Sequence, residues 1–222
     1  TRSRPGVRNA GAGSARPATM RVASAAAGVW TVLALADLVL GYGALAGRPL
    51  DAPTFGPELG LYVSSITLGR VGLGVVVVAA VTSVVAVLVR TPTGALWTAV
   101  LAAVALVLQA QTGHASGDTN HELAISTMFL HLAGAAVWIG GLAGLALVAG
   151  RLGRDLPAAV ARYSVVALWA FLAVATSGVV NAGLRLSGPA DLALTVYGRL
   201  VVAKVLLTAA LGALGWVHRR RV

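Results

Sequence analysis

Three histidines and a methionine near the middle of the chain are the residues best suited to chemistry. His114, His121, Met128 and His131 fall within 18 residues of one another. If a helix begins at His121, Met128 lies about 20° and His131 about 80° from it around the helix axis, so the three share one sector. Imidazole nitrogen and thioether sulfur together bind copper well, and the sulfur favours Cu(I). This set predicts a copper path, with His114 and His121 as capture residues and Met128 with His131 as an inner relay.

Acidic residues beside the first two histidines extend this interpretation. Asp118 and Glu122 place negative charge next to His114 and His121, and an acidic mouth with few bases attracts cations. A structural role stays open for each residue, because histidines also hydrogen-bond within helices, methionine fills cores and histidines in loops are ordinary exposed polar groups. His218 stands beside three arginines, which favours an interfacial role over metal binding.

Composition indicates where these residues must lie. Of the 222 residues, 58% are hydrophobic and 11% are charged, and the mean hydropathy is +0.85, whereas soluble domains carry about 25% charged residues. Soluble globular and disordered classes are therefore excluded. The absence of cysteine excludes disulfides, thiolate metal sites, iron–sulfur clusters and c-type haem attachment. The net charge of +10 matters less in a membrane protein than where the charges lie, so we expect no nucleic-acid partner.

Six apolar stretches are long enough to cross a bilayer, since a crossing helix needs about 20 apolar residues. They lack the alternating pattern of barrel strands, and helices satisfy their own backbone groups in lipid. We therefore expect an all-α, polytopic membrane helical bundle. The expected spans are residues 22–45, 66–89, 94–111, 123–149, 160–186 and 196–217.

Basic residues are distributed unequally between the two sides of this bundle. Twelve arginines lie in the termini and in the second and fourth connections, whereas Arg48 and Arg185 are the only two in the other connections. The positive-inside rule then places both termini in the cytoplasm. We expect a basic cytoplasmic tail at residues 1–21, an N-terminal three-helix membrane segment at 22–112 and a second three-helix segment at 113–222.

Charged residues inside the spans are expected to have partners. Asp37 lies about 12 Å below the end of its helix and Arg70 at least about 6 Å below the end of the next. Charges within a membrane usually pair inside the bundle, so we expect an ion pair between them, of structural importance or with a part in transport.

Gly140 and Gly144 form a GxxxG motif, which suggests a close helix contact.

The second half of the chain resembles the copper resistance protein D (CopD) family. The resemblance is seen in two runs of sequence, FLHLAGAAVWIGGLAGLAL at residues 129–147 and RYSVVALWAFLAVATSGVVNAGLRL at residues 162–186. The run TVYGRLVVAKVLLTAALGALGWVHRRR at residues 195–221 is similar to that family's final helix. The matching positions are His131, Trp138, Gly140, Gly141, Asn181, Tyr197, Gly198, Arg199 and Lys204. Members commonly have Asn where this chain has His218.

The resemblance implies a multi-pass protein of the bacterial cytoplasmic membrane that handles copper and brings it across. It also implies a periplasmic copper chaperone or a cytochrome oxidase assembly domain as partner, beside the lipid bilayer and copper itself. Lys204, about 12 Å deep in the last span, cannot easily reach the interface. We expect it to face the bundle, for hydrogen bonding or charge balance, or as a structural residue that bridges helix carbonyls.

Three function classes stay open. The first is a copper permease or import channel. The second is a factor that delivers copper for oxidase assembly. The third is a b-type haem protein, which the single deeply placed histidine, His131, disfavours because haem of that kind needs paired axial ligands. The sequence contains no nucleophile–base pair or phosphate loop, so we expect no enzymatic activity.

Overall fold

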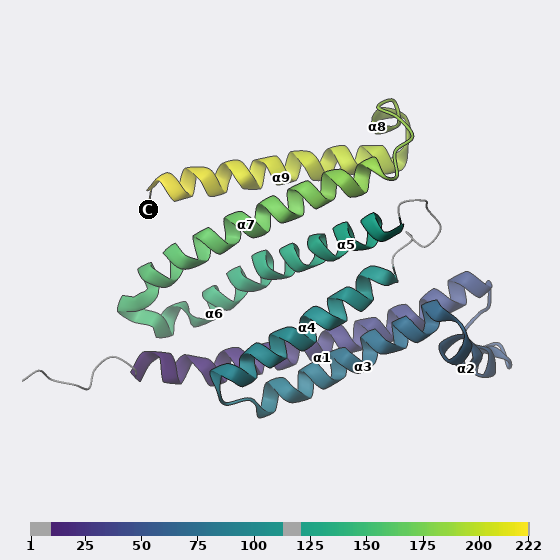
Figure 1. Cartoon of the computed structure of the whole chain (residues 1–222), viewed down its shortest axis with the longest axis horizontal. Helices are drawn as coiled ribbons and strands as arrows, with labels where there is room; N and C mark the ends of the chain where they lie inside the picture. Colours follow the sequence, from purple (N-terminus) through teal and green to yellow (C-terminus); the bar gives the residue numbers. More distant parts are fainter. Residues whose placement is uncertain (1–9, 113–120, 222) are drawn as a thin grey trace, which may run out of the picture. The chain divides into compact units, whose positions relative to one another are not determined.

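The computed structural model describes residues 10–112 and 121–221, and helices make up nearly all of this part of the chain (Figure 1). No strand occurs in these two ranges, which confirms the predicted all-α class. The elements are α1 (Ala10–Ala46), α2 (Phe55–Ser65), α3 (Thr67–Leu88), α4 (Pro92–Gln111), α5 (His121–Ala135), the π-helical turn η1 (Ala136–Gly140), α6 (Gly141–Leu152), the 3₁₀ turn η2 (Gly153–Asp155), α7 (Leu156–Gly183), α8 (Asp191–Leu194) and α9 (Val196–Arg221).

Helix ends follow local backbone chemistry. Gly47 has a φ of 62° directly after α1, the left-handed conformation that glycine adopts without strain at a helix C-terminus. Ile66 is extended and separates α2 from α3. The Thr91 hydroxyl accepts a hydrogen bond from the Gly94 amide, and Pro92 occupies the first turn of α4, as helix N-termini prefer.

Within the described residues, five continuous helical segments are long and apolar enough to cross a membrane. One of them, His121–Gly183, has 63 residues and contains both α5 and α7. Contacts join Thr127 to Asn181, His131 to Ser177 and Trp138 to Phe171. From one contact to the next, the residue number on the α5 side rises while the residue number on α7 falls. The two helices therefore run antiparallel, and this segment supplies two crossings. The expectation of about six spans is confirmed, and the orientation of the termini stays a prediction.

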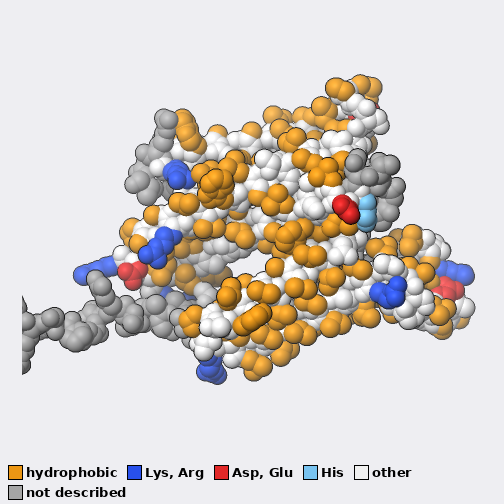
Figure 2. Space-filling model, viewed as in Figure 1, with side chains coloured by type: hydrophobic (Ala, Val, Ile, Leu, Met, Phe, Trp, Pro, Cys, Tyr) orange, Lys and Arg blue, Asp and Glu red, His pale blue; other side chains and the backbone are white. Residues whose placement is uncertain are grey.

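The surface has the character that a bilayer requires. Large apolar side chains such as Leu33, Leu88 and Leu206 are more than 60% exposed. On the face in Figure 2, hydrophobic side chains cover the helices along their length and charged side chains lie at helix ends. Such extensive apolar exposure is abnormal for a soluble monomer and is what lipid-facing helices show.

The chain divides into two compact units. The first unit comprises Thr1–Ser116 and Gly144–Leu156, and the second comprises Gly117–Ala143 and Pro157–Val222. The three segments predicted from the sequence, 1–21, 22–112 and 113–222, stay a prediction.

In the first unit, α3 packs against α1, α2 and α4. Reciprocal hydrogen bonds tie α1 to α3, because each of the Ser24 and Ser83 hydroxyls donates to the other residue's carbonyl at 2.9 Å. The core at the α2 end consists of Leu38, Tyr42, Phe55 and Tyr62. The Tyr42 ring lies 5.4 Å from the Phe55 ring and 5.1 Å from the Tyr62 ring, so α2 is held by aromatic packing.

In the second unit, aromatic and small residues connect the helices. Trp138 packs edge-on against Phe171 with 5.3 Å between ring centroids, and Gly212 of α9 lies against the same Phe171 ring. The backbone of α8 comes so close to Gly198 that a β-carbon there would collide with Asp191. Glycine at this position is therefore what allows α8 to fold onto the start of α9.

Candidate functional site

His131 on α5 contacts α7 through one nitrogen of its ring. Its Nδ1 lies 3.2 Å from the Val174 carbonyl oxygen and 3.1 Å from the Ser177 hydroxyl. A carbonyl oxygen can only accept, so Nδ1 carries the proton. The Ser177 hydroxyl donates to carbonyls of its own helix and thus accepts from the imidazole. In the neutral form of the ring, the nitrogen that has a lone pair is therefore Nε2.

Two glycines border this histidine. A β-carbon on Gly134 would lie 3.0 Å from the Val174 side chain and 3.1 Å from the Ala170 carbonyl, which is tighter than ordinary contact. One on Gly178 would lie 3.6 Å from Cε1 of His131, an ordinary van der Waals distance. Gly134, one turn from His131, thus lets α5 and α7 approach closely enough for the imidazole to reach the α7 backbone.

A second polar contact joins the same two helices one turn away. The Thr127 hydroxyl donates to the Asn181 side-chain oxygen at 2.9 Å. Residues four apart are one turn apart, about 6 Å along the axis, so Thr127–Asn181 and His131–Ser177 form a polar strip between α5 and α7. Asn181 is among the residues that the family resemblance predicts to be functional. The sequence gives no such signal for Thr127, whereas Ser177 lies four residues before Asn181 and so shares its face of α7.

The other candidate ligands lie along α5 rather than around one point. His121 begins the helix, Glu122 is exposed in its first turn and Met128 is half-buried one turn before His131. His121 and His131 are ten residues apart, which is about 15 Å along the axis, so they cannot share one ion. Within residues 10–112 and 121–221, no three His, Asp or Glu side chains form a metal cluster. His114 and Asp118 lie outside the described residues.

The predicted ion pair between Asp37 and Arg70 is wrong. In the described part of the chain, the ion pair is Arg48–Glu58, at 3.3 Å. Arg70 instead donates to the Thr67 hydroxyl at 3.4 Å. The reason is that α3 begins at Thr67, so Arg70 belongs to the first turn and reaches back along its own helix, whereas Asp37 lies nine residues inside α1.

Residues of the last helix differ in their exposure. Lys204 is exposed within its own unit, where α9 meets α7 through Gly212, and the expectation that Lys204 faces the bundle stays a prediction. Arg199 is also exposed. The half-buried Tyr197 carries the Arg185 guanidinium 5.9 Å above its ring, a cation–π contact that links α9 to the connection before it.

The VWIGGL motif has a structural explanation. The Trp138 carbonyl lies in the π-helical turn and accepts a hydrogen bond from the Tyr163 hydroxyl. A β-carbon on Gly141 would lie 2.5 Å from the Tyr163 ring, whereas none of the described atoms lies within 4 Å of one on Gly140 or Gly144. Within the described residues the close approach is made by Gly141, and the helix contact expected at the Gly140–Gly144 pair stays a prediction.

The carboxylate of Glu58, which lies outside the spans, is stabilised in its ionised form by neighbouring side chains. Hydrogen bonds from Thr54 and Tyr42, with a smaller effect of the nearby Arg48, hold the pKa of Glu58 below its usual value. The Tyr42 hydroxyl donates to Glu58 at 2.9 Å. Glu58 thereby connects the end of α1 to α2.

Comparison with known proteins relates most of the sequence to copper resistance proteins. Residues 4–124 match the family described as copper resistance protein D-like, N-terminal domain, and residues 157–222 match copper resistance protein D. The chain is 32% identical over 118 residues to copper transport protein CutJ of Bacillus subtilis (strain 168), a match that covers 51% of this chain and 22% of that protein. It is 28% identical over 207 residues to inner membrane protein YebZ of Escherichia coli (strain K12), covering 87% of this chain and 68% of that protein. The chain therefore spans about a fifth of the length of the Bacillus relative, and no solved structure matches it.

Proposed function

Because the chain belongs to the copper resistance protein D family, we propose that it carries copper ions across the bacterial cytoplasmic membrane and that His131 is a ligand on their path. Copper is here the cargo, and the family together with the apolar helices makes this a copper-related, multi-pass membrane protein. The name of the Bacillus relative, a copper transport protein, supports copper as the cargo.

The geometry of His131 is the observation that carries this proposal. Histidine ligands of metals usually donate their other ring N–H to a carbonyl, a carboxylate or water, which fixes the tautomer and orients the ring. His131 has this arrangement, with Nδ1 held by Val174 and Ser177 and Nε2 left with its lone pair. A neutral imidazole oriented in this way is prepared to ligate a metal without first losing a proton.

The remaining candidates support a sequence of binding sites rather than one site. Met128 precedes His131 by one turn of α5, so its thioether can act with Nε2 on a soft ion such as Cu(I). His121 stands about 15 Å away at the start of the helix, and His114 belongs to the connection before it. An ion would pass from the histidines at the helix start to Met128 and His131.

The decisive experiment measures copper binding and copper movement on the same variants. Purified full-length chain in lipid nanodiscs is titrated with Cu(I) against a coloured chelator, and sealed vesicles containing it are assayed for radioactive copper flux. We expect His131→Ala to lose tight binding and flux, and His121→Ala to weaken uptake only at low copper. A folded His131→Ala protein that binds and moves copper normally would overturn the proposal.

The same assays separate transport from delivery of copper to an oxidase assembly domain or exchange with a periplasmic chaperone. A transporter alone in vesicles moves copper to the other side. A delivery factor binds copper through His131 but gives no flux until its partner protein is added.

A further inference from the structure

The second unit contains a cavity of about 690 Å³ between α7 and α9, which run side by side in Figure 1. Its walls are mostly apolar, with Leu168 and Phe171 from α7 and Leu211 and Trp216 from α9. The side chains of Leu168, Leu211 and Trp216 are each more than 40% exposed. The cavity is therefore a groove that opens on the surface of this unit.

Glycines on α9 leave the room for this groove. A β-carbon on Gly212 would lie 2.8 Å from the Phe171 ring, so the two helices meet at this position. One turn further along α9, none of the described atoms lies within 4 Å of a β-carbon on Gly215. Trp138, which packs on Phe171 with 5.3 Å between the ring centroids, also lines the cavity. The groove is thus closed at the Phe171 end, where the helices touch, and widens at Gly215.

The other end of the groove is polar. Ser164 of α7 and Arg219 of α9 line it there. Each lies seven residues from the Phe171–Gly212 contact, which is about 10 Å along the helix axis. Because α9 runs antiparallel to α7, the hydroxyl and the guanidinium are at the same end of the groove.

This polar end lies at the level of the membrane interface. The part of α9 that is apolar enough to cross a membrane ends at Val217, so Arg219 follows its end by two residues, or about 3 Å. Trp216 lies at the same border, where tryptophan is enriched in membrane proteins. The groove therefore has a positive charge at headgroup level and an apolar channel that extends about 10 Å toward the hydrocarbon, which matches the polarity of a phospholipid.

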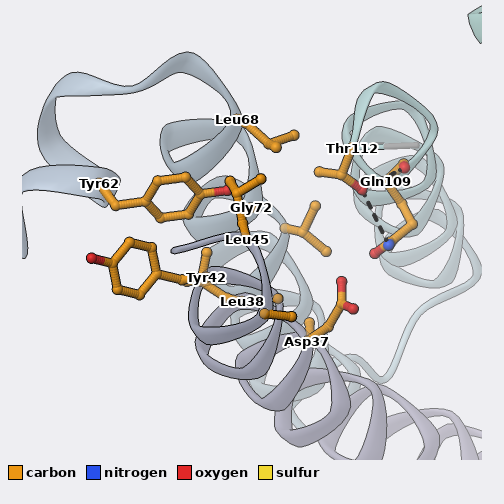
Figure 3. Close-up of a pocket in the computed structure, with 13 residues that line it drawn as sticks. Asp37, Leu38, Tyr42, Leu45, Tyr62, Leu68, Gly72, Gln109 and Thr112 are labelled. Carbon is orange, nitrogen blue, oxygen red and sulfur yellow. Dashed lines mark hydrogen bonds between the residues drawn. The ribbon is translucent and has the colours of Figure 1, made fainter. Parts of the chain in front are cut away.

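The charge of the groove favours an anionic headgroup. Arg219 is exposed, and Arg220 and Arg221 follow it in the sequence. Guanidinium groups bind phosphate oxygens with paired hydrogen bonds, and basic pockets between membrane helices bind anionic lipid headgroups. The hydroxyl of Ser164 is a further donor. The cavity of the first unit in Figure 3 differs, because the charged residue among those that line it is Asp37, and a carboxylate repels phosphate.

From these observations we propose that the groove between α7 and α9 binds one anionic diacyl phospholipid. Its phosphate lies against Arg219 and Ser164, and one acyl chain lies in the groove over Gly215 and extends toward Phe171. Free phosphate has no apolar part to cover the groove, so the lipid is the occupant. The site is separate from the copper ligands on α5 and does not depend on the proposed copper path.

Lipid binding measured by native mass spectrometry tests this site. The purified chain in detergent is titrated with phosphatidylglycerol or with phosphatidylcholine of the same acyl chains. We expect one phosphatidylglycerol to bind more tightly than phosphatidylcholine, and Arg219→Gln to bind it about fivefold more weakly, the effect of one basic residue at a membrane surface. Gly215→Leu should lose the bound lipid with its charges unchanged, because the new side chain fills the groove. The control is Arg90→Gln, which removes an exposed arginine between α3 and α4 and should bind as the wild type does.

A phosphatidylglycerol with a photoactivatable acyl chain locates the bound lipid. We expect its crosslinks to map to the residues of α7 and α9 that line the groove. Unlabelled phosphatidylglycerol should reduce them, whereas phosphatidylcholine and inorganic phosphate should not.

Three results would overturn the proposal: equal binding of the two lipids, crosslinks spread evenly over the apolar helices, or wild-type binding by both Arg219→Gln and Gly215→Leu. A groove filled by the first unit or by a second copy of the chain would give no crosslinks there, which overturns it as well. Thermal unfolding shows whether each variant is folded, and if Gly215→Leu is not, the affinity of Arg219→Gln decides.

Discussion

His131 has two properties that a metal ligand within a helical bundle needs, a fixed ring and a fixed tautomer. Both depend on α7, because Val174 and Ser177 are the acceptors for Nδ1. Removing one acceptor should therefore weaken the site without abolishing it, whereas removing the imidazole removes the ligand itself.

Replacement of Ser177 by alanine tests this dependence on α7. We expect Ser177→Ala to bind Cu(I) about tenfold more weakly, since loss of a partner behind a metal ligand typically costs 10–100-fold in affinity and Val174 still accepts from Nδ1. The control is Thr176→Ala, because Thr176 is exposed and its hydroxyl donates to carbonyls of its own helix. Equal affinities of the two variants in the chelator competition would contradict the role given to Ser177.

Glu58 provides a second test at the level of one residue. Its pKa in the folded protein is below the ordinary value of 4.5, so the ionised group stabilises the fold above that pH, and the contribution is lost as the pH falls through the lowered value. We expect the wild type to unfold at a higher temperature than Glu58→Gln at neutral pH, and the difference to vanish in acid. A difference that persists below the folded-state pKa would show that packing, not charge, is responsible.

Sequence periodicity predicted which candidate ligands share a helix, but it did not predict their partners. His121, Met128 and His131 lie on α5 as expected, because a helical repeat is a local property. The pairing of His131 with Ser177 depends on how α7 returns along α5 after the turn at Gly153–Asp155. The Asp37–Arg70 error has the same origin, since depth along two helices does not determine the direction of a side chain in the first turn.

At the scale of elements, the π-helical turn η1 is the feature that periodicity could not predict. It inserts an extra residue into the helical repeat between α5 and α6, and the Tyr163 hydroxyl binds the Trp138 carbonyl there. Gly141 provides the room for the Tyr163 ring. The turn, the tyrosine and the glycine therefore act together where η1 and Gly141 meet α7.

Adjacent glycines give this interpretation a matched test. A β-carbon at Gly141 would meet the Tyr163 ring at 2.5 Å, and one at Gly140 would meet none of the described atoms within 4 Å. We expect Gly141→Ala to lower the free energy of unfolding by about 1–3 kcal/mol, the usual cost of overpacking, and Gly140→Ala to change it little. Denaturation in mixed detergent micelles measures both. Similar losses in the two variants would show that helix propensity or lipid packing governs this segment instead.

Two short helices, α2 and α8, are also absent from the elements predicted from sequence. Residues 55–65 follow a proline-rich connection, and the apolar pattern marked spans of membrane length alone. Phe55 and Tyr62 nevertheless hold α2 on α1 by aromatic contacts, and Asp191 of α8 packs beside Gly198. Tertiary contacts, rather than intrinsic helix length, stabilise helices this short.

At the scale of the whole molecule, hydropathy predicted the spans because lipid imposes one requirement on every crossing segment. The predicted ranges 66–89 and 196–217 agree with α3 and with the start of α9. Orientation depends on something else, the unequal distribution of arginines between the connections. That asymmetry predicts cytoplasmic termini and is testable without reference to copper.

The 222-residue sequence contains no cysteine, so a cysteine introduced into it is its only thiol. We expect Ser187→Cys, in the connection between α7 and α8, to react with a membrane-impermeant maleimide on intact spheroplasts. Ser3→Cys in the N-terminal tail and Arg154→Cys in the turn between α6 and α7 should react only after the membrane is permeabilised, because the basic segments are retained on the cytoplasmic side. The reverse pattern, or labelling of all three from outside, would contradict the orientation. It would also reverse the direction in which copper meets the start of α5, since an odd number of crossings separates that helix start from both termini.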